Sequence, residues 1–535
     1  MPRARLTIAL SLLLAAAVAS AVPSAARARR ASRADDRVGN VDFPTSCTPQ
    51  AQPALDKGLA LLHSFQYSES EQSFAAAAQS DPQCAMAYWG QAMSHYELLW
   101  DFPDEKQLAE ARKNIDLAQK AAKQSPRESE YIAAAAGFFN SDSKLSHADR
   151  TKIYVDAMGK LHDDNPGDVE AGALYAVALV SLADYNVDEL ANRRKAIAIL
   201  NPLFAAHPNN PGVAHYLIHA ADVPELAAQG LPAARAYAKI APGSAHAIHM
   251  PSHIFWRLGL WQELIDSNNA AVLCASAATK AGRGEAHYQL HPMDFLSYGY
   301  LQSGQESKAR HLVDELKDVP GAKPEDIAEH ESVFEARNAV ELHRWKEAAA
   351  LPVHDEKLIA LDVTYWARAL GSARTGDVAG ARQAADKLAE VTQAQIEHDK
   401  KLGNPIKPGK TVMQQEADAW IAFANGQTDA ALAGLRAADE RERAQREDSY
   451  AAPAGEMLAD MLLELKRPQE ALDEYQKVLK DYPNRFDAVL GAAQAADGAS
   501  HHDLAQVFYS QLRNISAPGA DRPELQAGRN MSNGH

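Results

Sequence analysis

Small and aromatic residues recur along this chain with a spacing of 34 residues. In the first clear unit, which begins at residue 51, Gly58, Tyr67, Phe74, Ala77 and Pro82 occupy positions 8, 17, 24, 27 and 32. Two antiparallel helices explain this spacing: the glycine lets the helices approach, the aromatic side chains fill the space between them, and the proline ends the second helix. The pattern therefore predicts one pair of helices per unit.

The same spacing returns farther along the chain. Residues at positions 20, 24, 27 and 32 of later units include Ala381, Ala385 and Leu388, then Ala431, Leu435 and Ala438, and finally Ala471, Tyr475, Val478 and Pro483. Ser125 to Glu128 has the arrangement of a capping box at the start of another helix. Strand-like alternation is missing. We therefore expect an all-α fold, a right-handed superhelical solenoid of helix-turn-helix repeats over residues 46–515.

On these positions the chain resembles the tetratricopeptide repeat superfamily. Beyond the generic repeat, four segments resemble a recurring group of exported bacterial repeat proteins that has no assigned function: Asp81–Gly90, His215–Asp222, His246–Phe255 and Pro483–Phe486. The resemblance implies a superhelix whose first helices line a concave groove, with positions 2, 5, 9 and 12 facing the ligand. It also implies binding of a peptide or a partner protein in that groove.

Histidines gather in three rows within residues 211–294, at spacings that place side chains on one face of a helix. The rows are His215, His219 and Asp222, then His246, His249 and His253, then His287, His291 and Asp294. In the repeat register the first row takes positions 5, 9 and 12 and the second row takes positions 2, 5 and 9, all of which face the groove. The third row fits less well, because His287 is expected to precede its helix, and Pro251 is expected to kink or delay the helix of the second row.

These rows suggest a metal site. Neutral imidazole suits Zn, Cu, Fe or Ni, and a carboxylate either binds the metal or orients a histidine that does. First helices of neighbouring repeats lie about 10 Å apart, so imidazoles from adjacent rows can meet. We therefore interpret all nine residues of the three rows as candidate ligands of a transition metal, Zn, Cu or Fe, at one or two sites.

Three functions remain open on the sequence. The first is a binding protein that holds a metal together with a partner or ligand in its groove. The second is a metal-free scaffold for protein interactions, in which each histidine is an ordinary polar or packing residue. The third is a metal-dependent enzyme, in which Asp222 or Asp294 orients a ligand or acts as a base near a metal-bound water. No phosphate loop, HExxH, GxSxG or dinucleotide motif is present, so we expect no nucleotide cofactor and favour binding over catalysis.

Composition narrows the choice of partner. The chain has 535 residues, 46% of them hydrophobic and 23% charged, and carries a formal net charge of −16. This length exceeds one compact core and suits either several domains or one repeat array. An acidic surface argues against a nucleic-acid partner.

The N-terminus indicates export. A basic start and an apolar run predict a signal peptide over residues 1–21, with Ala26 as a second cleavage site and an uncleaved anchor as the alternative. We expect a flexible segment over residues 22–45, a disordered tail over residues 516–535, no further membrane span, and a periplasmic or secreted protein. A helical hairpin brings Cys47 close to Cys84, so an exported chain can form a disulfide there and leave Cys274 outside it.

Overall fold

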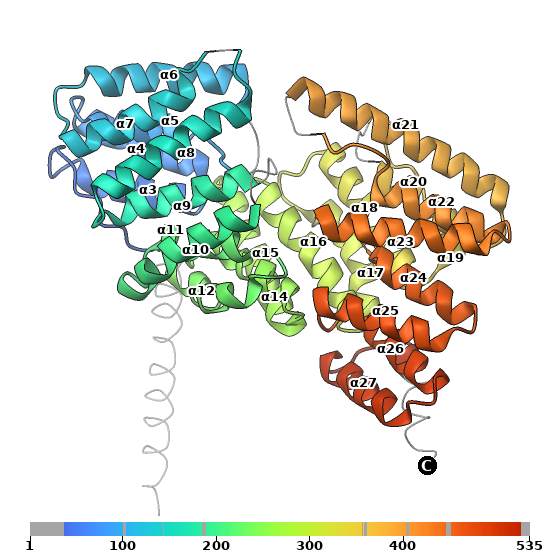
Figure 1. Ribbon diagram of the computed structural model, residues 1–535. Coiled ribbons are helices and arrows are strands. Elements are labelled where there is room, and N and C mark those ends of the chain that lie inside the picture. The colour runs from blue at the N-terminus through green and yellow to red at the C-terminus, as the bar shows by residue number, and fades with distance from the viewer. Residues whose placement is uncertain are drawn as a thin grey trace, which may run out of the picture.

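The computed structural model describes residues 37–99, 103–142, 144–183, 189–355, 357, 361–402, 406–445 and 451–525. Within these ranges the chain forms α-helices, one short 3-10 helix and connecting turns, with an isolated β-bridge between Cys84 and Lys123. Consecutive helices pack in pairs, and successive pairs stack on one another (Figure 1). The expected all-α solenoid of helix-turn-helix repeats is therefore confirmed. The predicted signal peptide lies outside the described residues.

Helices begin close to where the 34-residue spacing predicts. The first third contains α3 (Gln52–His63), α4 (Tyr67–Ser80), α5 (Ala85–Met93), α6 (Glu105–Lys120), α7 (Pro126–Phe139), α8 (His147–Asp164), α9 (Val169–Ala183) and α10 (Glu189–Ala206). The predicted capping box is present at the start of α7, where the Ser125 side chain accepts from the Glu128 backbone and the Glu128 side chain accepts from the Ser125 backbone.

The middle of the chain carries the histidine rows. It contains α11 (Pro211–Ala221), α12 (Ala227–Ile240), α13 (Ala245–His249), α14 (Pro251–Arg257), α15 (Trp261–Lys280), α16 (His287–Gln302), α17 (Glu306–Glu315), the 3-10 helix η1 (Leu316–Asp318) and α18 (Pro324–Glu341). The last third contains α19 (Trp345–Ala349), α20 (Asp362–Arg374), α21 (Val378–Leu402), α22 (Val412–Ala424), α23 (Thr428–Gln445), α24 (Ala454–Glu464), α25 (Pro468–Asp481), α26 (Phe486–Gly498) and α27 (His502–Ile515).

Close packing in the first repeat follows the rule read from the sequence. A Cβ atom on Gly58 would lie 3.0 Å from the ring of Phe74, and one on Gly90 would lie 2.2 Å from it. The Phe74 ring therefore fills the space that these two glycines leave between α3, α4 and α5. Buried apolar residues continue in this way from repeat to repeat, in one cluster from Phe43 to Leu342 and a second from Ala336 to Leu525.

Cys47, before α3, and Cys84, after α4, form a disulfide with their Cα atoms 4.9 Å apart. It joins the two ends of the first helical hairpin. Cys274 lies on α15 and is not part of this bridge.

Residues 22–45 and 516–535 are expected to be flexible or disordered from their composition, but their described parts pack against the helices. Phe43, within the expected flexible segment, is buried, with its ring 5.3 Å from that of Tyr131 and 5.9 Å from that of Trp89. Arg522, within the expected tail, is buried and donates two hydrogen bonds to Asp487 at 2.9 and 3.0 Å. Both expectations are wrong for these parts, because folded repeats bury the two side chains, Phe43 against α5 and α7 and Arg522 against α26, and composition does not reveal such partners.

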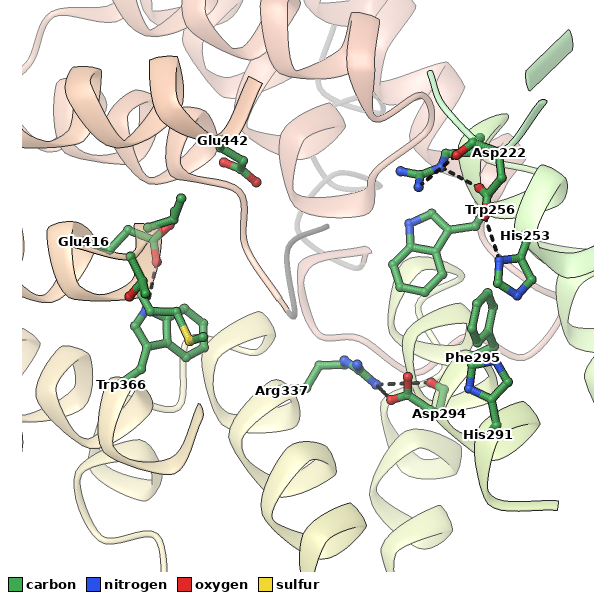
Figure 2. Close-up of a pocket in the computed structure, with 14 residues that line it drawn as sticks. Asp222, His253, Trp256, His291, Asp294, Phe295, Arg337, Trp366, Glu416 and Glu442 are labelled. Carbon is green, nitrogen blue, oxygen red and sulfur yellow. Dashed lines mark hydrogen bonds and ion pairs between the residues drawn. The ribbon is translucent and has the colours of Figure 1, made fainter. Parts of the chain in front are cut away.

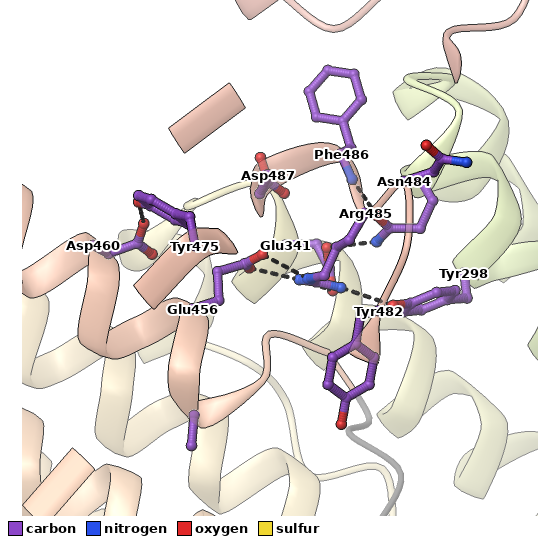
Figure 3. Close-up of polar contacts among 12 residues, drawn as sticks. Tyr298, Glu341, Glu456, Asp460, Tyr475, Tyr482, Asn484, Arg485, Phe486 and Asp487 are labelled. Carbon is purple, nitrogen blue, oxygen red and sulfur yellow. Dashed lines mark hydrogen bonds and ion pairs between the residues drawn. The ribbon is translucent and has the colours of Figure 1, made fainter. Parts of the chain in front are cut away.

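The C-terminal repeats fold back onto the middle of the chain. Arg485, at the start of α26, is fully buried and donates to both carboxyl oxygens of Glu456, to Glu341 and to the hydroxyl of Tyr298, all within 2.9 Å (Figure 3). One guanidinium thus joins α16, α18, α24 and α26. Beside it, Trp261 donates to the backbone carbonyl of Asn484 at 2.7 Å.

We expect Arg485→Met to lower the free energy of unfolding by about 3 to 5 kcal/mol, because it leaves buried carboxylates without their cation. Arg467 is the control, since its ion pair with Glu470 is exposed and its replacement by Met should change stability by less than about 1 kcal/mol. Denaturant unfolding of both variants measures the difference. Equal losses would contradict the bridging role of Arg485.

Gly259 lies where the loop after α25 meets the loop after α14. It has a φ of +63°, and a Cβ atom there would lie 2.0 Å from the backbone oxygen of Pro483. Gly426 has a φ of +76° with nothing within 4 Å of such an atom. We expect Gly426→Ala to lower the free energy of unfolding by about 1 to 2 kcal/mol, because alanine disfavours a positive φ. Gly259→Ala should lower it by about 1 to 3 kcal/mol more, because its Cβ atom also clashes with the backbone of Pro483. Similar thermal unfolding of the two variants would argue against a tight contact between these loops.

Candidate metal centre

The three histidine rows lie on four helices of the middle repeats. Asn210 caps α11 by accepting a hydrogen bond from the backbone of Val213, and Ser244 caps α13 in the same way. The helix of the second row is divided at Met250, so that α13 ends at His249 and α14 begins at Pro251. The proline therefore acts as a first-turn residue, and the histidines on either side of it still face the neighbouring rows.

The first group of converging imidazoles consists of His215, His219 and His246, which we call the inner triad. Nε2 of His215 lies 3.0 Å from Nε2 of His219 and 3.1 Å from Nε2 of His246. Within the triad the ligand nitrogens all lie within 4.8 Å of one another. His215 and His246 are buried and His219 is half-buried. Two side chains come from α11 and one from α13, so the triad joins two rows.

The second group consists of His249, His253 and His291, which we call the outer triad. Nε2 of His249 lies 3.1 Å from Nε2 of His253, and the ring of His291 is centred 4.5 Å from that of His249. Their ligand nitrogens also lie within 4.8 Å of one another. His249 is buried, whereas the other two are half-buried. This triad joins the second row to the third.

Hydrogen bonds determine which nitrogen of three histidines is free to bind a metal. His215 Nδ1 donates to the backbone carbonyl of His63 at 2.6 Å, and His253 Nδ1 donates to Asp222 at 2.9 Å. His249 Nδ1 lies 2.6 Å from Oδ1 of Asn268, whose amide nitrogen donates to the carbonyl of Leu264, so the histidine is the donor. In the neutral tautomer of each ring, Nε2 then carries a lone pair directed into its triad.

Burial favours the neutral form of five imidazoles of the triads. It lowers the pKa of His215 and of His291 to about 3. Burial, together with the neighbouring imidazoles, lowers the pKa of His219, His246 and His249 well below 6.5. Neutral imidazole is the form that binds metal, so protons compete little for these sites near neutral pH.

Three of the nine predicted ligands fall outside the triads. Asp222 orients His253 and accepts from Arg257 at 2.9 Å, and Asp294 accepts from Arg337 at 2.7 Å. Burial alone would raise the pKa of Asp222, but Arg257 and His253 lower it well below its usual range. His287 is the first residue of α16 and stacks on His291, with ring centres 5.7 Å apart. The expectation that it precedes the helix is wrong, since the helix starts three residues before the repeat register implies.

A pocket of about 550 Å³ borders the outer triad (Figure 2). His253 and His291 line one wall together with Asp222, Trp256, Asp294 and Phe295. Trp366, Glu416 and Glu442 line the opposite wall, and Arg337 lies between the two. The inner triad does not line this pocket. The two triads therefore differ in their surroundings: the outer one borders a cavity, and the inner one does not line it.

Several residues of the site carry no signal in the sequence. His63, which lies outside the three rows, supplies the carbonyl that orients His215 from 152 residues away. Asn268, Trp256 and Arg337 become visible only once the helices are packed. The far wall of the pocket comes from α20, α22 and α23, more than 70 residues beyond the last histidine row.

Comparisons with known proteins leave the function open. No protein-family model matches the chain, and no curated protein matches it either. Among solved structures, the human IFIT1 dimer with m7Gppp-AAAA is 13% identical, with 91% of this chain and 94% of that chain covered and a TM-score of 0.35. The human IFIT1 dimer with PPP-AAAA is 12% identical, covering 86% and 90% of the two chains with a TM-score of 0.34. No helix in the described ranges is long and apolar enough to cross a membrane.

Proposed function

We propose that this protein binds two transition metal ions, one in each triad, inside a tetratricopeptide-like scaffold. The contact between His249 and His253 supports this most directly. Both rings donate from Nδ1 to an oxygen, and their Nε2 atoms lie 3.1 Å apart. In the neutral rings two lone pairs then face each other, which is unfavourable unless a cation lies between them.

A proton could satisfy one such pair, but each triad has a third imidazole nitrogen within 4.8 Å of the other two. Three nitrogens that each lie about 2.0 to 2.1 Å from one ion are separated from one another by about 3.3 Å in tetrahedral geometry. The distances of 3.0 and 3.1 Å in the triads are close to this value. The donors are imidazoles alone, which suits Zn, Cu or Fe better than Mg or Ca.

We place this function outside the cytoplasm, in the periplasm or the medium. The basic and apolar N-terminus has the pattern of an export signal. The bridge between Cys47 and Cys84 supports the same assignment, because disulfides persist in oxidising compartments. In this proposal the solenoid is a binding protein that presents the metal to a partner or ligand in its concave groove.

A metal-dependent enzyme is the second candidate. The observation that favours it is the opening of the outer triad onto the pocket, since catalytic sites keep a coordination position for water or substrate. If the triads bind no ion, the protein is a metal-free scaffold for protein interactions.

Metal analysis of the mature protein tests the proposal. The protein should be purified without a polyhistidine tag, incubated separately with Zn, Cu and Fe ions, dialysed, and analysed by plasma mass spectrometry. We expect the protein to retain about one ion per triad of at least one of these metals. If the protein retains none of these metals, the metal proposal is wrong and only the metal-free interaction scaffold is left.

A further inference from the structure

The outer triad is the place where a ligand can reach a bound metal. His253 and His291 form part of the pocket wall, and the side chain of His253 is 19% exposed. Three imidazoles leave at least one coordination position of a transition metal unfilled. Because the cavity lies on this side of the triad, the unfilled position of the outer metal faces the pocket.

Charge at the outer triad favours an anion. The three ligands are imidazoles, of which His249 and His253 are fixed as Nδ1 donors to Asn268 and Asp222. The two nearby carboxylates are already balanced, Asp222 by Arg257 and Asp294 by Arg337. A divalent ion bound here therefore keeps most of its positive charge in a partly buried place, where charges interact strongly. An oxyanion in the open position would neutralise part of it.

The wall beside this position is aromatic. The ring of Phe295 is centred 4.7 Å from those of both His249 and His253, and it packs edge-on against Trp256 at 4.9 Å. Trp366, Val412 and Met413 add apolar surface across the cavity. The far carboxyls are engaged, Glu416 with the indole nitrogen of Trp366 and Glu442 with the hydroxyl of Tyr482.

We propose that the pocket binds a small aromatic oxyanion, a carboxylate or phenolate, whose oxygen coordinates the outer metal and whose ring packs against Trp256 and Phe295. The cavity volume of about 550 Å³ is within the range of small-molecule sites, about 300 to 1,000 Å³. This inference rests on the proposed metal binding and adds the class of ligand. The anionic end lies at the triad, and the ring extends toward Trp366.

Cobalt absorption provides the test. A His219→Gln variant weakens the inner triad, so that the d–d absorption of bound Co²⁺ reports the outer site. Benzoate, acetate and benzyl alcohol are then titrated in. We expect benzoate to change the spectrum and to bind at least roughly tenfold more tightly than acetate, as one aromatic contact of about 1.4 kcal/mol would give. Benzyl alcohol, which has the ring without the charge, should leave the spectrum unchanged.

Two further variants identify the contact. Trp256→Ala should remove most of the preference for benzoate over acetate, and Trp256→Phe should restore it, while both keep Co²⁺ bound. Failure of the variant and of the wild type to bind Co²⁺ would overturn the metal proposal and this inference with it. Bound Co²⁺ whose spectrum does not respond to benzoate, or responds equally to acetate, would overturn this inference and leave the metal proposal in place.

Discussion

The His219→Gln variant should retain one metal ion fewer than the wild-type protein, and the His291→Gln variant should do the same at the other triad. Each substitution removes one of three ligands while leaving a polar side chain of similar size. Loss of an outer-shell partner alone costs about 10 to 100-fold in metal affinity, so loss of a ligand should cost at least about 100-fold. Both residues are half-buried, which limits the effect on folding. Competitive titration with a metal indicator measures the two sites.

His287→Gln is the control for this pair. His287 belongs to the same sequence pattern and stacks on His291, yet it is not a member of either triad. The variant should therefore hold both ions with nearly unchanged affinity. Loss of an ion in His287→Gln, or retention of both in His219→Gln, would show that the triads are not the metal sites.

The metal-free protein should lose stability steeply as the pH falls below about 6.5. Unfolded histidines take up a proton near pH 6.5, whereas burial lowers the pKa of His215 and His291 to about 3 in the folded protein. Between these values the unfolded chain binds more protons than the folded one, so the free energy of unfolding decreases by about 1.4 kcal/mol per pH unit for each such histidine. Five imidazoles of the triads shift in this direction, His147 outside the triads does so as well, and their effects accumulate. Denaturant unfolding between pH 7 and 5 measures the slope.

Bound metal should raise the free energy of unfolding across this pH range, because it binds to the folded state alone. It should leave the slope at least as steep, because the metal-bound imidazoles carry no proton. The His219→Gln variant without metal should show a shallower slope than the wild type, since one shifted histidine is gone. A free energy of unfolding that stays constant from pH 6.5 to 5 would mean that the imidazoles of the triads are not held neutral by burial.

The candidate site could be predicted in part. Spacings of three, four and seven residues placed each histidine row on one helix face, and adjacent repeats brought the rows together. The pattern does not show that the second row is divided, with His246 joining the inner triad and His249 and His253 joining the outer one. It also suggests carboxylate ligands, whereas Asp222 and Asp294 pair with arginines from other turns of the chain. The imidazole nitrogens that converge in each triad are determined by the directions of the side chains across the interface between helices.

The sequence by itself determined the repeat and several helix starts, although α16 begins three residues before the register implies. Position 20 at Ala431 implies a unit that begins at residue 412, and α22 begins at Val412; the register likewise places Pro211 first in its unit, and α11 begins there. Such features are local, because caps, prolines and apolar spacing act within a few turns of one helix. Only the tertiary structure decided the pocket and the contact through which Arg485 joins the C-terminal repeats to the middle of the chain. Both bring together side chains from repeats more than 70 residues apart. Contacts of that kind depend on how small rotations between successive repeats add up along the solenoid, which no single repeat encodes.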